Sequence, residues 1–353
     1  MTNAVASSKP LIALLAAPET SPSVLYGFYD VLLSVGAVYP DMTAGTPGDA
    51  MLDVRIVAAT DQPFRCFGNV PVEPHGVVNE IDRADVVIVC DVYTPIDCAP
   101  HGRYAPEIAW LQRMHRNGAL IASVCSGSLI LAEAGLLDGR ECTAHWAYRD
   151  LFREHYPKVK LSAGSILNLS CETEGIITAG GVTSWQDLAL HIIARLCGTQ
   201  HALRTAKIFL LSGHEDGQLP FASMCRRVQS NDAIIASCQS WVADNYTCEN
   251  PVASMAEYSG LAPRTFARRF RAATGYLPME YVHALRIEEA KQIIETEDGD
   301  MDEAGYRVGY EDPTFFRRLF KRQVGLTPAA YRKKFNGLCM KGPSDSRGAT
   351  AAV

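Results

Sequence analysis

No hydrophobic run in the sequence of 353 residues is long enough to cross a membrane. The longest apolar run near the start covers residues 11–17 and is followed by Pro18 and Glu19, whereas a helical span needs about 20 apolar residues. No basic stretch precedes this run and no cleavage site follows it, so a secretory signal peptide is not expected. We therefore expect a soluble, cytoplasmic protein.

Disulfide and metal-site patterns are missing as well. The 11 cysteines are odd in number, and none forms a Cys-x-x-Cys pair. Scattered cysteines in a long chain predict reduced thiols rather than a disulfide scaffold. Because the cysteines have no metal-ligand spacing and no cofactor motif accompanies them, we expect neither a metal nor a cofactor.

Charge is modest in amount and uneven in distribution. Hydrophobic residues make up 48% of the chain and charged residues 20%, with a net charge of −6. This composition is typical of a globular protein and argues against disorder. Residues 1–200 hold 13 Lys and Arg against 21 Asp and Glu, whereas residues 201–353 hold 20 against 18. An acidic front and a mildly basic back suggest two domains with separate tasks.

The front half alternates short apolar runs with helical stretches. The runs cover 11–16, 54–59, 85–89 and 119–124, and they are rich in Val, Ile, Leu and Ala without polar alternation. Such runs are typical of strands buried on both faces of a parallel sheet. Helices are expected between them, for example over 24–35 and 104–117. This order predicts a doubly wound parallel α/β sheet domain, which we place at residues 8–198.

The back half contains an internal repeat. After a linker at 199–231, which includes a candidate helix over 201–211, residues 232–335 are helical in pattern. Residues 50 positions apart match in type: Phe266 and Phe316, Arg268 and Arg318, Phe270 and Phe320, Gly275 and Gly325, Pro278 and Pro328, Tyr281 and Tyr331. Each copy predicts a helix, a tight turn and a second helix with a buried phenylalanine stripe. The small, polar tail 336–353 is expected to be flexible.

Basic charge is concentrated on the second helix of each copy. Residues 263–271 and 314–322 contain no acid, whereas the helix that joins the copies is rich in glutamate. The basic side chains are Arg264, Arg268, Arg269 and Arg271 in the first copy and Arg317, Arg318, Lys321 and Arg322 in the second. Phosphates attract such cations and base edges bind arginine, so the pattern predicts paired DNA recognition helices. The alternative is a pair of solvated basic helices in an ordinary bundle.

Residues 232–335 resemble the DNA-binding domain of the AraC/XylS family of transcription regulators. The second copy carries the resemblance in VGYEDPTFFRRLFK at 308–321 and GLTPAAY at 325–331. The resemblance implies an all-α double helix-turn-helix domain, with each recognition helix in a major groove of double-stranded DNA. The DNA contacts are expected from Arg264, Arg268, Arg269, Thr314, Arg317, Arg318 and Lys321. Ala304 and Gly305 depart from the family pattern, and glycine inside a helix costs about 0.5–1 kcal/mol relative to alanine.

A candidate chemical site lies in the front half, where the run 119–124 leads into Cys125-Ser126-Gly127-Ser128 and then a helix. A cysteine on a sharp turn between strand and helix is a nucleophile-elbow arrangement, and Gly127 lets the turn close. The helix N-terminus is expected to lower the thiol pKa and to offer N–H groups to an anion. Downstream, His145 is placed where it could approach the thiol as a Cys–His pair.

This region resembles the ThiJ/PfpI domain, which is similar to class I glutamine amidotransferases and implies a flavodoxin-like fold. Residues 125–146, with LAEAGLLDG at 131–139, carry the resemblance together with Ala179-Gly180-Gly181, Trp185 and Asp187. In this order the two domains look like the GlxA-type branch of AraC-family regulators, over about residues 10–335. Such a regulator would use its front domain to sense an effector and to dimerise.

The acid of the catalytic relatives is the departure that matters. In them a glutamate after the first strand sits beside the elbow cysteine, whereas Val24 holds that position here and Glu19 lies five residues earlier. We therefore expect no enzyme, with Cys125 and His145 as vestigial candidates for catalysis. The alternatives are a Cys–His amidase or hydrolase tethered to DNA, a redox sensor acting through Cys125 oxidation, and a purely structural domain.

Ligands of open α/β sheets bind beyond the carboxyl ends of the strands. The ligand-binding residues expected there are Glu19, Cys125, Ser126, His145 and Trp146. Aromatic groups beside an acid suit a small cation, such as a quaternary amine or an amino acid. We thus expect a homodimeric transcriptional regulator, an activator that contacts RNA polymerase, whose partners are a double-stranded DNA operator and a small-molecule effector. No membrane partner is expected.

Overall fold

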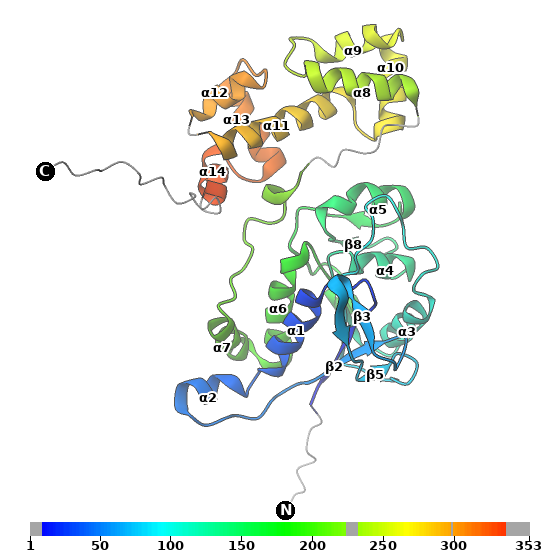
Figure 1. Ribbon diagram of the computed structural model, residues 1–353, viewed down its shortest axis with the longest axis vertical. Coiled ribbons are helices and arrows are strands. Elements are labelled where there is room, and N and C mark those ends of the chain that lie inside the picture. Colours follow the sequence, from blue (N-terminus) through cyan, green and yellow to red (C-terminus); the bar gives the residue numbers. More distant parts are fainter. Residues whose placement is uncertain (1–8, 224–231, 298, 337–353) are drawn as a thin grey trace, which may run out of the picture. The chain divides into compact units, whose positions relative to one another are not determined.

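The computed structural model describes residues 9–223, 232–297 and 299–336, and the chain divides into two compact units, Met1–Gln218 and Leu219–Val353. Figure 1 traces both units in chain order. Each unit has hydrophobic clusters of its own, two in the front unit and two in the rear unit. No helix of the described ranges is long and apolar enough to cross a membrane.

The front unit is built on a seven-stranded sheet with the order β10-β11-β7-β6-β1-β2-β5. All neighbours are parallel except β10, which runs antiparallel to β11. In the register of the central strands, Leu14 of β1 lies opposite Ile56 of β2 on one side and Ile88 of β6 on the other. The sheet strands are β1 (Leu11–Leu15), β2 (Asp53–Ala58), β5 (Gly76–Val77), β6 (Val86–Val89), β7 (Leu120–Val124), β10 (Leu167–Asn168) and β11 (Ile176–Ala179). The predicted doubly wound α/β fold is confirmed.

Helices cover both faces of this sheet because its strands alternate side chains between two apolar clusters. Ile12 and Leu14 pack with α1 and α6, which lie side by side in Figure 1, whereas Ala13 and Leu15 pack with α3, α4 and α5. The helices are α1 (Pro22–Leu33), α2 (Val38–Ala44), α3 (Ala105–Arg116), α4 (Gly127–Glu133), α5 (Arg149–His155), α6 (Trp185–Cys197) and α7 (Thr199–Phe209). Two strand pairs, β3 (Phe64–Cys66) with β4 (Val70–Val72) and β8 (Glu141–Cys142) with β9 (Lys160–Leu161), complete the unit.

The front unit extends beyond the predicted boundary at residue 198. Helix α7 packs against α6 and α2, and Gln218 is buried in the front unit. Residues 199–218 are therefore part of this unit, and the prediction of a linker from residue 199 is wrong for them because the amphipathic α7 buries its apolar face. Residues 224–231 of that linker, and all of the predicted flexible tail except Asn336, lie outside the described residues.

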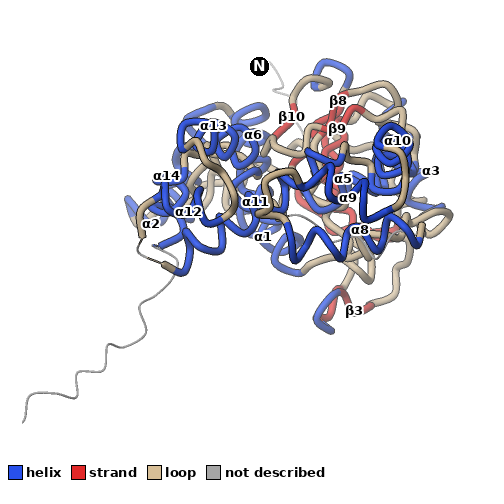
Figure 2. The backbone as a smooth tube through the Cα atoms, turned by 90° about the horizontal axis from the view of Figure 1, so that it is seen from above, coloured by secondary structure: helices blue, strands red, loops and turns tan. Residues whose placement is uncertain are grey.

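The described part of the rear unit consists of helices and turns (Figure 2). Its helices are α8 (Ala233–Asn245), α9 (Pro251–Ser259), α10 (Pro263–Thr274), α11 (Pro278–Thr296), α12 (Met301–Arg307), α13 (Pro313–Val324) and α14 (Pro328–Asn336). Helix α11 joins two cores: Val282 belongs to the first, with α8, α9 and α10, and Ile287 to the second, with α12, α13 and α14. The two predicted helix-turn-helix copies are thus α9–α10 and α12–α13.

Prolines and glycines set the limits of the recognition helices α10 and α13. Pro263 and Pro313 occupy the first turns, where a missing N–H is harmless. Gly275 and Gly325 end the helices in the left-handed conformation. Asp312 caps α13 by accepting a hydrogen bond from the Thr314 N–H at 2.8 Å. These local signals explain where both helices begin and end.

Candidate functional site

Cys125 stands on a sharp turn between β7 and α4, as the elbow pattern predicts. Its φ of 57° is in the left-handed region, which is uncommon for a residue with a side chain. Neighbouring backbone holds it there: the Cys125 N–H donates to Ala179 O at 3.0 Å, and its carbonyl accepts from Ser128 Oγ at 2.7 Å. The strained conformation is therefore fixed by surrounding hydrogen bonds.

Gly127 allows the elbow to approach the end of β6. A Cβ atom at this position would lie 2.5 Å from Val89 O and 2.7 Å from Cys90 O. The adjacent Ser126 also ties the elbow to the segment that follows β6. Its Oγ donates to Val92 O at 2.6 Å and accepts from the Val92 N–H at 3.0 Å. Ser126, expected to bind ligand, is thus engaged in holding the elbow against β6.

The pKa of the elbow thiol is higher than the sequence predicted. Burial raises the pKa of the Cys125 thiol to about 12, and the nearby Asp91 carboxyl adds to the rise. The prediction that the helix N-terminus lowers this pKa is wrong, because Cys125 is 5% exposed and loss of solvation outweighs the N–H groups of the short α4. The thiol carries its proton at neutral pH.

An acid does lie near the cysteine, but it comes from β6 and not from the segment after β1. Asp91 follows this strand and is 4% exposed. Its Oδ2 accepts a hydrogen bond from Ser21 Oγ at 2.5 Å, while its Oδ1 is buried and has no hydrogen-bond partner among the described residues. Burial raises the pKa of Asp91 to about 6. The sequence signal, an aspartate directly after the run VVIVC, was missed.

Glu19 is committed to another partner. Its Oε1 pairs with Arg103 Nη2 at 2.5 Å, and its Oε2 accepts from the Tyr104 hydroxyl at 3.2 Å. Val24, the position of the acid in catalytic relatives, is fully buried in the core. The carboxyl that interacts electrostatically with the elbow thiol is Asp91, and Glu19 is neutralised by an arginine.

His145 and Trp146 lie together beyond β8, with ring centroids 5.0 Å apart. The Nδ1 of His145 accepts a hydrogen bond from the Ala147 N–H at 3.2 Å, and burial lowers the pKa of this histidine, so its neutral form is favoured. Within the described residues, no hydrogen bond joins His145 to Cys125. The structure therefore places the two vestigial candidates at the same end of the sheet without forming a Cys–His pair.

Gln218 was missed by the sequence analysis. It is 3% exposed, and its Nε2 donates to Ala144 O at 3.0 Å, next to His145. Its only sequence signal is that it follows Gly217, whose φ of 71° marks a tight turn. It brings a further buried amide to the end of the sheet where Cys125 and His145 lie.

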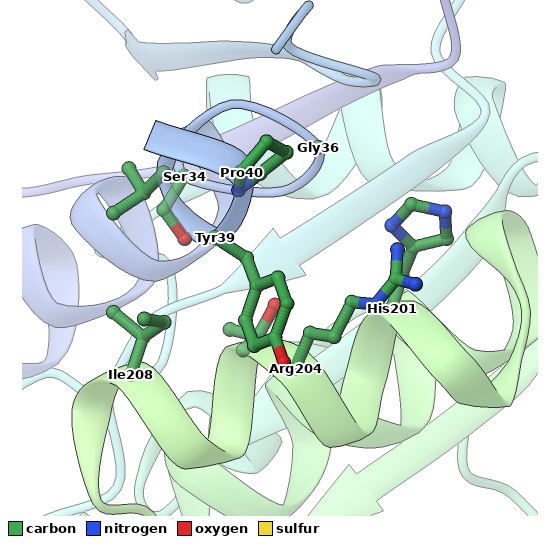
Figure 3. Close-up of a pocket in the computed structure, with 9 residues that line it drawn as sticks. Ser34, Gly36, Tyr39, Pro40, His201, Arg204 and Ile208 are labelled. Atoms are coloured by element: carbon green, nitrogen blue, oxygen red, sulfur yellow. The ribbon is translucent and has the colours of Figure 1, made fainter. Parts of the chain in front are cut away.

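A separate small pocket lies between α2 and α7 (Figure 3). Tyr39 of α2 faces Arg204 of α7, whose guanidinium lies 5.2 Å from the ring centroid. His201 and Thr205 line the α7 side. No sequence motif pointed to this pocket. Elsewhere in the described ranges, no three His, Cys, Asp or Glu side chains gather in a way that could hold a metal.

The recognition helices present the predicted cations to solvent. Arg264 and Arg268 of α10, and Arg318 and Lys321 of α13, are exposed and make no ion pair within the described residues. Thr314 is exposed at the start of α13, where its own N–H is used by the Asp312 cap. The free cations are the groups available to an anionic partner.

Two of the predicted DNA contacts are engaged inside the rear unit. Arg269 forms a two-pronged ion pair with Asp232, the residue that caps α8. It matches the buried Leu319 in the repeat but keeps 40% of its side chain exposed, so a DNA contact by Arg269 stays a prediction. Arg317 pairs in the same way with Asp302 of α12, with Nε 2.8 Å from Oδ1, although it stays exposed.

The two units match two known families. Residues 31–195 match the DJ-1/PfpI family, and residues 255–334 match a helix-turn-helix domain. The chain is a DJ-1/PfpI domain followed by an AraC-type helix-turn-helix domain. Both halves of the resemblance drawn from the sequence are thereby confirmed.

Relatives with the same domain pair cover most of the chain. The HTH-type transcriptional regulator CdhR of Pseudomonas aeruginosa is 26% identical over 86% of this chain and 88% of its own length. The HTH-type transcriptional regulator GlxA of Rhizobium meliloti is 28% identical over 72% of this chain and 77% of its own. The HTH-type transcriptional regulator GbdR of P. aeruginosa is 25% identical over 80% and 73%. These relatives are similar across both the DJ-1/PfpI domain and the AraC-type domain.

Proposed function

We propose that the protein is a DNA-binding transcriptional regulator whose DJ-1/PfpI domain senses a small metabolite. The observation that carries the DNA-binding part is a pair of exposed arginines, Arg268 on α10 and Arg318 on α13, at equivalent positions of the two copies and without an ion pair among the described residues. Arginine binds guanine edges in the major groove with two hydrogen bonds. Relatives of matching length that are transcriptional regulators support this reading.

The remaining cations have a different task in this proposal. Arg264 and Lys321 lie at the start and in the last turn of their helices, where they would neutralise phosphates and set the register on DNA. Arg317 would have to exchange Asp302 for a phosphate or a base. Arg269 stays with Asp232 and supports the orientation of α10 from within.

The sensing part rests on the elbow. The buried Asp91 Oδ1 without a partner offers an acceptor to a hydrogen-bond donor or a cation, and Trp146 and His145 supply aromatic surface at the same end of the sheet. An amino acid or a small amine has this chemistry, with Asp91 in the role that the sequence assigned to Glu19. We further propose that the protein is a cytoplasmic homodimer, formed through the front domain, and an activator that contacts RNA polymerase.

Catalysis by the elbow is not part of this proposal. A thiol with a pKa of about 12 is a poor nucleophile at neutral pH, because the thiolate is the reactive form. The Nδ1 of His145 accepts a hydrogen bond from the Ala147 N–H, and His145 makes no hydrogen bond to the thiol within the described residues. The hydrolase and redox alternatives therefore lack a supporting observation at Cys125.

Footprinting of genomic DNA fragments with the full-length protein tests the proposal. Arg268→Ala and Arg318→Ala should each weaken specific binding by about 1–3 kcal/mol, and each should lose protection at a different half-site because the two helices read separate grooves. Arg116→Ala, an exposed arginine of α3 in the front unit, is the matched control and should leave both footprints intact. An equal loss on every sequence would show phosphate contacts only, and the absence of any wild-type footprint at low salt would refute DNA binding.

A further inference from the structure

Gln218 is fixed by hydrogen bonds at the elbow end of the front sheet. Its Nε2 donates to Ser165 O at 2.8 Å, to Ala144 O at 3.0 Å and to Thr143 Oγ1 at 3.3 Å. Two carbonyl oxygens beside the same atom settle the orientation of the amide, because the opposite orientation would place Oε1 against them. The Oε1 atom is consequently directed elsewhere; it is buried and has no hydrogen-bond partner among the described residues.

The free Oε1 borders the proposed effector site. A Cβ atom on Gly181 would lie 3.4 Å from Gln218 Oε1 and 3.6 Å from Cδ2 of His145, so the amide and the imidazole flank the same glycine. At Gly180 a Cβ atom would lie 2.2 Å from Gln218 Nε2. Because Gly180 and Gly181 have no side chains, the side chain of Gln218 fits against the backbone that follows β11. Its amide therefore lies beside His145.

The backbone before Gln218 is fastened to the front unit as well. His214 pairs through Nδ1 with Asp187 Oδ2 at 2.7 Å, and its Nε2 lies 3.2 Å from Thr183 Oγ1. The Gln218 N–H donates to Gly164 O at 2.9 Å. Residues 214–218 are therefore held at both ends against the loops at the carboxyl edge of the sheet.

The residues just after Gln218 are fastened to the rear unit. The 3-10 turn η5 (Leu219–Phe221) packs against the recognition helix α13. Phe221 contacts Phe335 of α14 edge to face, with ring centroids 5.4 Å apart. The buried Lys291 of α11 donates its Nζ–H to Ala222 O. The anchors of the rear unit therefore begin at the residue that follows Gln218 in the chain.

We propose that residues 214–222, the coupling strap, transmit occupancy of the elbow site to the second recognition helix through Gln218. A ligand N–H or O–H that pairs with Gln218 Oε1 would displace the amide from its carbonyl partners or hold it more firmly. Either change reaches η5 directly, because Leu219 follows Gln218 in the chain; Pro220 inside η5 has a fixed φ, and η5 lies on α13. This inference rests on the proposed sensing function and names the residue that reads the ligand.

Hydrogen–deuterium exchange of the full chain, without added ligand, tests the strap. Gln218→Met keeps the length of the side chain and removes its three hydrogen bonds, and we expect exchange in α13 to rise roughly three- to tenfold. Phe221→Ala, at a half-exposed rear anchor, should raise exchange in α13 similarly. If both substitutions act through the strap, exchange in α13 of the double variant should be little higher than in either single variant, because the effects of coupled sites are not additive.

Gln112→Met is the matched control, because Gln112 Nε2 donates to Ala134 O at 2.9 Å in the front unit with no link to the strap. It should leave α13 unchanged. Unchanged exchange in α13 of Gln218→Met, or fully additive effects with Phe221→Ala, would overturn the strap. Should Gln218→Met fail to fold, a flexible Gly-Ser insertion between Gln218 and Leu219 keeps all anchors and should produce the same rise in exchange.

Operator binding is measured on the same samples to separate the two proposals. If the wild-type protein footprints DNA but Gln218→Met does not change exchange in α13, the coupling strap is refuted and the proposed regulator function is not. Wild-type protein that binds no DNA would refute the regulator, whatever the exchange of α13 shows.

Discussion

At the level of single residues, burial decides the chemistry of the elbow more than the identity of the side chains. A cysteine at a strand–helix turn suggests a reactive thiolate, yet the Cys125 environment raises its pKa to about 12. The same burial raises the pKa of Asp91 to about 6. At neutral pH the thiol therefore keeps its proton while Asp91 is largely ionised, which suits recognition of a cation or a hydrogen-bond donor better than attack on a substrate.

Asp91→Asn should change how the stability of the front unit depends on pH. The native state holds the Asp91 proton up to about pH 6, whereas the unfolded chain releases it near pH 3.8. Wild-type stability should therefore fall as pH rises through this window, by about 3 kcal/mol, and stay lowered above it. The variant lacks this group, so its stability relative to wild type should rise by that amount between pH 4 and pH 7 in urea unfolding.

The comparison cancels other titrating groups. Glu107 of α3 also has a raised pKa through burial, but it contributes equally to wild type and variant. The absolute effect of asparagine at this position includes its contact with Ser21, which does not vary over the window. A difference between the two proteins that is independent of pH would show that Asp91 titrates normally.

At the level of elements, the glycine in α12 has a packing role that helix propensity hides. The sequence suggested that Gly305 weakens the support helix of the second copy. In the structure a Cβ atom at Gly305 would lie 2.7 Å from Cδ1 of the fully buried Phe316 of α13. The absence of a side chain therefore lets α12 and α13 approach each other, and the local cost of glycine is offset by this contact.

Gly305→Ala should consequently destabilise the rear unit despite the better helix propensity of alanine. Overpacking of a close helix contact costs about 1–3 kcal/mol, which exceeds the gain of about 0.5–1 kcal/mol from propensity. Thermal unfolding of the rear unit measures the difference. Gly299→Ala is the matched control, because a Cβ atom there meets nothing within 4 Å. Equal stability changes for both substitutions would contradict the packing role.

The elements that the sequence predicted best are those with local signals at both ends. Helices α10 and α13, the predicted second helices of the two copies, begin at a proline and end before a glycine. The four buried strand runs were found because consecutive apolar residues indicate a parallel sheet. Short pairs such as β3–β4 and β8–β9 were not predicted, since two or three residues carry no periodicity. Helix α7 was found but assigned to a linker, because only its packing on α6 reveals its unit.

At the level of the whole molecule, more of the fold than of the candidate site could be predicted from the sequence. The elbow, its glycine and the cations of the recognition helices could be predicted because each is local in the chain. Asp91 and Gln218 reach the elbow from other parts of the chain, placed there by strand order and by a chain reversal at Gly217. The ion pair of Arg269 was not predicted because its partner Asp232 is 37 residues away. Contacts distant in sequence are fixed by topology, which no local pattern contains.

The division into two units predicts that DNA binding survives without the front domain. Residues 219–340 contain both cores of the rear unit, both recognition helices and the η5 anchor. We expect this fragment to fold and to bind the operator. On the two recognition helices, the solvent-exposed cations without an ion pair in the described residues are Arg264, Arg268, Arg271, Arg318, Lys321 and Arg322.

Phosphate contacts by these cations should make binding strongly dependent on salt. Each neutralised phosphate contributes about −0.9 to the slope of log K against log salt concentration, so phosphate contacts by the four cations other than Arg268 and Arg318 predict a slope of roughly −3 to −4. Arg264→Ala in the fragment should reduce the slope by about one, because it removes one such contact, whereas Arg332→Ala should not, since that guanidinium is bound to Gly299 O and Glu297 O. Titrations by fluorescence anisotropy at several salt concentrations measure the slope. A fragment that shows the helical circular dichroism of the rear unit yet binds no genomic DNA at low salt would mean that the recognition helices need the front domain to reach DNA.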